Sequence, residues 1–192
     1  RLLEVFRSGG SSSPGGRKAF HIFAKNAKMG NAKAQRHLAK MYYRGEGVLP
    51  SLEKAGKWMK KAAKNGDITA QVKAAEWYHR GIAVEKDLKR ASFWYGKAAE
   101  AGDAEAKTNL GVFYAMGWGV ERDPKRAVEL FREAMSAGHV SAMHNLANCY
   151  ERGNGVAKDI EKAKKFYDLA AQKGHIAARS ALFKLMKEGA KK

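Results

Sequence analysis

The side chains that could do chemistry in this sequence are few and scattered. There are six histidines and one cysteine among 192 residues. His139 and His144 lie five residues apart and have no third ligand at a spacing that suits a metal ion. The sequence also lacks a glycine-rich phosphate loop, a G-x-S-x-G nucleophile elbow and an H-E-x-x-H zinc motif. We therefore predict a protein that is not an enzyme and that has no metal site and no cofactor.

The composition indicates a helical protein with a strongly basic surface. The chain is 45% hydrophobic and 29% charged, contains three prolines, and carries a formal net charge of +18. No run of eighteen apolar residues occurs, so we predict no transmembrane segment. The single cysteine excludes an internal disulfide, and it leaves the redox environment and the compartment open.

Two series of glycines recur every 36 residues and predict a repeat architecture. The first series is Gly30, Gly66, Gly102, Gly138 and Gly174, and the second is Gly45, Gly81, Gly117, Gly153 and Gly189. A fixed period of this length is typical of stacked helical hairpins, because one hairpin alone cannot bury both of its apolar faces.

Each repeat is predicted to contain two helices. Leu110, Phe113 and Tyr114 lie on one face of a first helix, and the other repeats have apolar residues at the same positions. Cys149 occupies the position of Phe113, which predicts a buried and inert thiol. We expect the second helices to be capped at their N-termini by Ser51, Asp87, Asp123 and Asp159. We expect them to end at left-handed glycines of the first series.

The period divides the chain into repeats with defined limits. These are a truncated, degenerate first repeat at residues 1–30, full repeats at 31–66, 67–102, 103–138 and 139–174, and a C-terminal capping helix, half a repeat, at 175–192. The stretch SGGSSSPGG at residues 8–16 has an alternative interpretation as an engineered tether. We prefer the repeat, because a shift of 36 residues places Leu2 on Leu38 and Phe6 on Tyr42 without a gap. Since the chain would then begin inside a helix, we expect more protein upstream, including a possible signal or targeting segment.

The motif in each unit resembles the Sel1-like repeat, a relative of the tetratricopeptide repeat. The stretch NLGVFYAMGWGVERDPKRAVELF carries, in that family's order, Leu110, Gly111, Tyr114, Gly117, Gly119, Val120, Asp123, Lys125, Arg126 and Ala127. One departure is Ala83, which replaces the second loop glycine of its repeat. The resemblance implies an all-α, right-handed superhelical solenoid of helix-turn-helix repeats with a concave groove. It also implies a non-catalytic scaffold or adaptor that binds a protein or peptide in that groove.

Side chains beside the core stripe of the first helices are expected to line the groove, by analogy with tetratricopeptide arrays. They are Arg36, Lys40, Tyr43, Arg44, Val72, His79, Arg80, Val112, Met116, Trp118, His144, Asn148 and Arg152. Val112, Met116 and Trp118 would form an apolar centre with arginines on both sides, which favours a partner with acidic residues around a hydrophobic anchor. Alternatively, Met116 and Trp118 pack against the next repeat and the arginines are merely solvated.

The basic charge of the second helices suggests RNA or another polyanion as an alternative partner. We rank it second, because the aromatic residues of the second helices belong to the core pattern and leave no stacking platform among the lysines. Those aromatic residues are Trp58, Trp94, Phe131 and Phe166. A solvated lysine face is the more ordinary explanation of the charge. The sequence determines neither the identity of the partner nor the oligomeric state.

Overall fold

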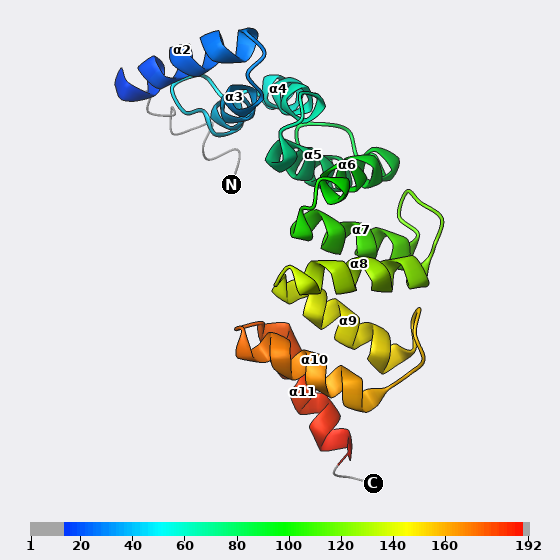
Figure 1. The fold of residues 1–192 in the computed structure, drawn as a ribbon. Helices are drawn as coiled ribbons and strands as arrows, with labels where there is room; N and C mark the ends of the chain where they lie inside the picture. The colour runs from blue at the N-terminus through cyan, green and yellow to red at the C-terminus, as the bar shows by residue number, and fades with distance from the viewer. Residues whose placement is uncertain (1–13, 190–192) are drawn as a thin grey trace. The chain divides into compact units, whose positions relative to one another are not determined.

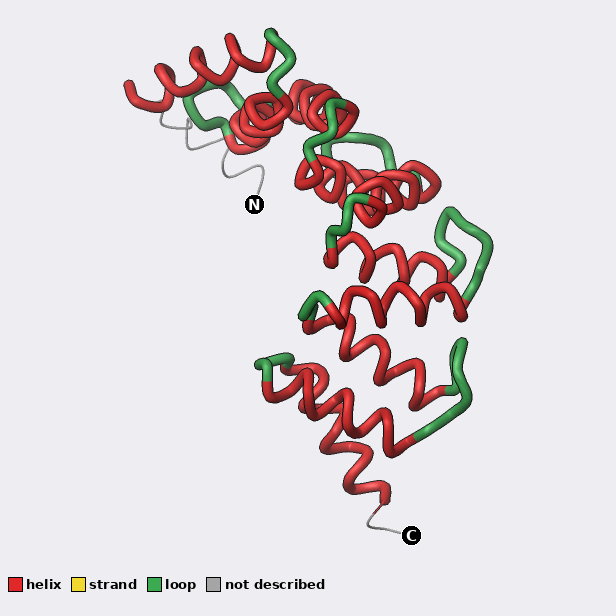
Figure 2. The backbone as a smooth tube through the Cα atoms, viewed as in Figure 1, coloured by secondary structure: helices red, strands yellow, loops and turns green. Residues whose placement is uncertain are grey.

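The computed structural model describes residues 14–189, and every regular element in this range is an α-helix (Figure 1). The helices are α2 (Pro14–Lys28), α3 (Ala32–Arg44), α4 (Leu52–Lys64), α5 (Ile68–Arg80), α6 (Leu88–Glu100), α7 (Ala104–Met116), α8 (Pro124–Ser136), α9 (Val140–Arg152), α10 (Ile160–Gln172) and α11 (Ile176–Gly189). Figure 2 shows only turns and loops between them, with no strand in the described range. The predicted all-α fold of helical repeats is confirmed.

Helix starts recur with the period of the sequence. The first helices α3, α5, α7 and α9 each have 13 residues and begin 36 residues apart. Within repeats α3 packs against α4, α7 against α8, and α9 against α10. Contacts between repeats pair α4 with α5 and α8 with α9. In each of these pairs a helix packs on its neighbour in the chain, as in solenoid repeat proteins.

Side-chain caps determine where the helices begin. Each second helix is preceded by a residue whose side-chain oxygen accepts a hydrogen bond from the backbone N–H three residues ahead. These residues are Ser51, Asp87, Asp123 and Asp159, as predicted. Asn31, Asp67 and Asp103 cap α3, α5 and α7 in the same way. The bonds satisfy N–H groups that have no partner inside the helix.

Residues in the left-handed conformation end the helices and shape the loops. The predicted glycines Gly66, Gly102, Gly138 and Gly174 have φ values from 81° to 91°. Ala83 is the one non-glycine residue of the described range with positive φ, at 57°. It occupies the loop position held elsewhere by Gly47, Gly119 and Gly155, so its side chain bears the steric cost of that conformation.

The core consists of small residues at helix crossings and aromatic rings between successive helices. One cluster contains Ala55, Ala62 and Met59 of α4 together with Trp77 of α5, all between 0% and 5% exposed. Another joins Phe131 of α8 to Cys149 of α9, which is 5% exposed. Alanine at the crossings allows close approach of the helix axes. Burial raises the pKa of the Cys149 thiol to about 11, as expected for an inert cysteine.

The chain separates into two compact units, with unit 1 ending at Ala98 and unit 2 beginning at Ala99. One kind of close backbone contact recurs at equivalent positions in the two units. A Cβ atom built on Gly47 would lie 2.1 Å from the carbonyl oxygen of Gly16, and one built on Gly155 would lie 2.1 Å from that of Pro124. Both pairs are 31 residues apart, and they are related to each other by a shift of 108 residues, which is three periods.

The division into a degenerate first repeat, four full repeats and a terminal helix stays a prediction. Residues 14–28 form a helix that packs on α3. The prediction that Leu2 and Phe6 belong to the stack lies outside the described residues. None of the helices between residues 14 and 189 is long and apolar enough to cross a membrane.

Candidate protein-binding surface

Four of the predicted groove residues meet on the first helices of unit 1. Lys40, Tyr43 and Arg44 of α3 and Arg80 of α5 line a cavity of about 170 Å³. The other lining residues are Met59, Lys73, Glu76, Trp77 and Ile82. The rings of Tyr43 and Trp77 lie 5.5 Å apart between centroids and form an aromatic wall. This cavity combines an apolar surface with a ring of charged side chains.

The charge around this cavity is mainly positive. Glu76 is the one carboxylate that lines it, and it pairs with both Lys73 and Arg80. Arg44 contacts Glu46 outside the cavity, at 3.3 Å. The pKa of Lys40 is lowered, first by burial and then by the charges of Arg36, Arg44 and Lys73. A partly buried ammonium group in a positive field would gain from an added carboxylate.

Three further groove residues of unit 1 have different surroundings. The Nε atom of Arg36 donates to both carboxylate oxygens of Asp67, at 2.9 and 3.1 Å. Asp67 also caps α5, so this pair ties α3 to the next repeat. Val72 is buried, at 9% exposure, and is core rather than open surface. His79 is partly buried, and burial is the first cause that lowers its pKa, followed by Lys86 and Arg80.

The three apolar groove residues of unit 2 differ in exposure. Met116 is 58% exposed at the end of α7. Trp118 is partly buried, and its ring meets Phe113 edge-on with centroids 5.7 Å apart. Val112 packs against the cluster that contains Phe131. Of the predicted apolar centre, Met116 is therefore the residue that offers open apolar surface.

The remaining groove residues lie on α9 and differ in their surroundings. His144 stacks on His175, the residue before α11, with ring centroids 4.7 Å apart. Its pKa is lowered, first by burial and then by the charge of His175. Asn148 is partly buried near Tyr167 of α10, whose hydroxyl donates a hydrogen bond to Glu151 at 2.6 Å. Arg152 is exposed at the C-terminus of α9.

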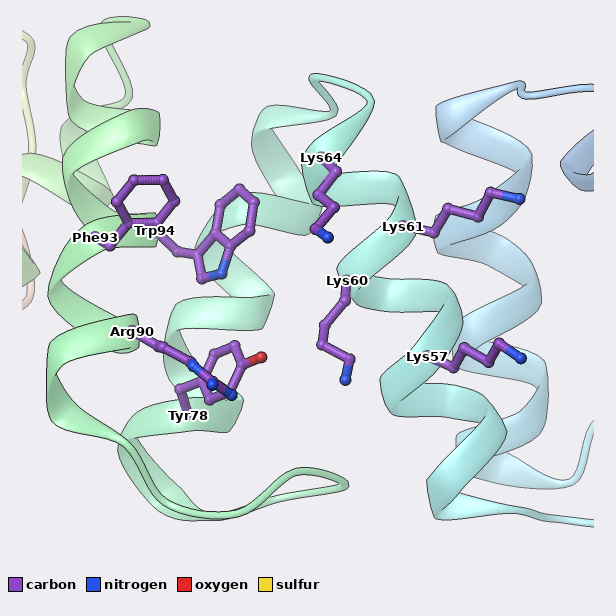
Figure 3. Close-up of a pocket in the computed structure, with 8 residues that line it drawn as sticks. All are labelled: Lys57, Lys60, Lys61, Lys64, Tyr78, Arg90, Phe93 and Trp94. Carbon is purple, nitrogen blue, oxygen red and sulfur yellow. The ribbon is translucent and has the colours of Figure 1, made fainter.

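A second surface, on the second helices of unit 1, was missed in the sequence. One cavity of about 600 Å³ is lined by lysines of α4 and by Arg90, Phe93 and Trp94 of α6 (Figure 3). Phe93 is 54% exposed. The expectation that no aromatic platform lies among the lysines was therefore wrong. The overlooked signal is that Phe93 stands where the other repeats have Lys57, Glu129 and Lys165.

Comparisons with known proteins agree on one family. The model of the Sel1 repeat matches residues 32–67, 68–103, 104–139 and 140–175. The structure is similar to c5321, a protective antigen of uropathogenic Escherichia coli strains that displays an SLR fold. The TM-score is 0.83, and the sequences are 32% identical over 88% of this chain and 36% of that one. It is also similar to a Sel1 repeat protein from Oxalobacter formigenes, with a TM-score of 0.78 and 36% identity over 86% of this chain and 66% of that one. The chain therefore spans less than two thirds of either relative. No curated protein matches the sequence.

Proposed function

This chain belongs to the Sel1 repeat family, and from that premise we propose that it is a scaffold whose first helices hold an acidic segment of a partner protein. Sel1 repeat proteins bind proteins, and their fold typically serves as a non-catalytic interaction scaffold. The chemistry of the ligand and the choice of surface are the new elements of this proposal.

The observation that supports it best is the cation cluster around the small cavity of unit 1. Lys40, Arg44, Lys73 and Arg80 share this cavity with one carboxylate, that of Glu76. The lowered pKa of Lys40 reflects its burial and the excess of positive charge. A carboxylate from a partner would neutralise part of that field and accept charge-assisted hydrogen bonds.

The existing ion pairs of Arg44 and Arg80 oppose the binding of a ligand carboxylate only weakly. Arg44 pairs with Glu46, and Arg80 pairs with Glu76. The arginine side chain is 63% exposed in each pair. Exposed pairs of this kind contribute about 0.2–1 kcal/mol each, so a ligand carboxylate can replace them at small cost. Tyr43 is partly buried beside the core residue Trp77, and its ring offers the apolar contact that a hydrophobic anchor of the ligand would use.

The proposal can be tested with short random peptides displayed on phage and selected on the wild-type protein. We expect the selected sequences to be enriched in Asp and Glu around a hydrophobic residue. The Arg44→Glu/Arg80→Glu double variant should bind the synthetic versions of these peptides about tenfold or more weakly, because repulsion replaces attraction. Fluorescence anisotropy of labelled peptide gives the dissociation constants.

A matched control separates this site from the overall charge. Lys165 of α10 and Lys173, the residue that follows this helix, are exposed, and Lys165→Glu/Lys173→Glu changes the net charge by the same amount. This control should keep nearly the affinity of the wild type. Equal weakening in both double variants, or selected peptides without acidic residues, would contradict the proposal.

A further inference from the structure

We propose that the cavity between α4 and α6 binds single-stranded nucleic acid, with phosphates at Lys60, Lys64 and Arg90 and a base stacked on Phe93. The cavity of about 600 Å³ is lined by Lys57, Lys60, Lys61, Lys64, Tyr78, Arg90, Phe93 and Trp94, all of unit 1. Its size falls in the range of pockets that hold small ligands. This site lies apart from the proposed peptide site and does not depend on it.

The lysines of α4 form a like-charged face that the fold does not need. Lys57, Lys60, Lys61 and Lys64 form four pairs that are three or four positions apart, so neighbours on the helix surface repel each other. No Asp or Glu is among the residues that line this cavity. The other repeats have mixed residues at the positions equivalent to Lys60, Lys61 and Lys64. These residues are Gly96, Lys97 and Glu100 in α6, Arg132, Glu133 and Ser136 in α8, and Asp168, Leu169 and Gln172 in α10. The repeat therefore does not require the uniform charge, which is instead suited to an anionic ligand.

Phe93 is likewise not required by the repeat. Its equivalents Lys57, Glu129 and Lys165 are charged, so helix packing does not demand an apolar residue at this position. The ring is nevertheless 54% exposed and meets Trp94 edge-on, with centroids 5.1 Å apart. An exposed ring held by an aromatic neighbour among cations is the arrangement that proteins use to stack bases of single strands.

The side chains converge on the space between the two helices. Figure 3 shows Lys60 and Lys64 pointing from α4 toward Tyr78 and Trp94, whereas the ammonium groups of Lys57 and Lys61 point away from those rings. Lys61 accordingly lies over the Trp58 ring, 5.2 Å from its centroid. Three cations, Lys60, Lys64 and Arg90, are thus placed to contact phosphates.

The base of the cavity is aromatic. Tyr78 is 5% exposed, and the Arg90 guanidinium lies 5.6 Å from its ring centroid. Arg90 also pairs with Asp87 at 3.2 Å, and this exposed pair is weak enough to yield to a phosphate. Arg90 can therefore contact an aromatic ring and an anion at the same time.

The adjoining surface limits the path of the ligand. A neighbouring cavity of about 530 Å³ shares Lys57, Lys60, Tyr78 and Arg90 but is also lined by Glu53 and Glu85. These carboxylates would repel phosphates, so the strand is expected to leave from the Lys64 end. A nucleotide supplies both a negative charge and a flat π surface, which matches the pairing of lysines with an exposed ring better than carboxylates alone.

The decisive variant is Phe93→Lys, measured by fluorescence anisotropy with a fluorescein-labelled oligouridine. Lysine occurs at this position in two other repeats and should leave the helical circular dichroism unchanged. The variant adds a positive charge, so a purely electrostatic surface would bind the oligonucleotide more tightly. Loss of a stacked base should instead weaken binding about tenfold.

Salt dependence tests the phosphate contacts. The Lys60→Gln/Lys64→Gln variant should reduce the slope of log affinity against log salt by about 1.4, which is about 0.7 for each lost phosphate contact. The Lys165→Gln/Lys173→Gln control removes the same charge from α10 and its C-terminal cap and should change the slope much less. Equal slopes in both double variants would show diffuse attraction and overturn the proposal.

Two other results would also overturn it. One is unchanged or tighter binding by Phe93→Lys. The other is a polyglutamate peptide that displaces the oligouridine at lower concentration than unlabelled oligouridine does, which would assign the cavity to an acidic protein. Weaker binding by Phe93→Lys together with weak competition by polyglutamate supports the nucleic-acid site.

Discussion

Replacing Gly155 by alanine should destabilise the protein much more than replacing Gly138 by alanine. Both glycines have a left-handed backbone, with φ values of 78° and 81°. Nothing lies within 4 Å of a Cβ atom at Gly138, whereas a Cβ atom at Gly155 would lie 2.1 Å from the carbonyl oxygen of Pro124. The pair of variants therefore separates backbone strain from collision between repeats.

The expected magnitudes follow from these two contributions. In Gly138→Ala the cost is that of an alanine in the left-handed backbone conformation, so the free energy of unfolding should fall by about 1 kcal/mol. Gly155→Ala bears that cost and also pushes its loop away from the start of α8. Overpacking adds about 1–3 kcal/mol, for a total of about 3 kcal/mol.

Urea unfolding followed by circular dichroism at the helix band measures both values, and thermal unfolding gives a second reading. The melting temperature should fall by about 3 °C for Gly138→Ala and about 9 °C for Gly155→Ala. Equal losses in the two variants would show that the close contact between Gly155 and Pro124 does not hold the loop. The reasoning from repeat packing would then be refuted.

Four further predictions test other parts of the structure. Asp123→Ala should cost about 1 kcal/mol of unfolding free energy, since it removes the cap of α8, and Asp123→Asn should cost less in the same urea titration. With its pKa raised to about 11, Cys149 should react with a thiol reagent at pH 8 about a hundredfold more slowly in the native protein than in urea. The pKa of His144 is lowered by burial and by His175. Its contribution to stability is therefore complete above about pH 6.5 and is lost as the pH falls through the folded pKa. Because His144→Gln removes this group, the unfolding free energy of the variant should fall less steeply with acidification than that of the wild type. Ala83→Gly should raise the melting temperature, because it relieves a left-handed alanine.

The helices and their limits could be predicted from the sequence because the forces that set them are local. The capping Asp123 acts on a backbone N–H three residues ahead, and the left-handed Gly138 acts on its own backbone. The 36-residue period repeats these signals, so one helical hairpin predicts the others. Burial of Cys149 followed from its register with Phe113.

The composition of the candidate surfaces was decided by tertiary contacts between different repeats. Arg36 is held by Asp67, 31 residues away, and Val72 turns into the core, although both share the helix face of Lys40 in sequence register. Register gives the face of a residue, whereas exposure depends on the side chains that the neighbouring helix brings against it. The same dependence placed Phe93 of α6 and Lys60 of α4 around one cavity. The sequence alone therefore determined a helical repeat and its core, and only the packing of one repeat on the next decided which charges and rings remain open to a ligand.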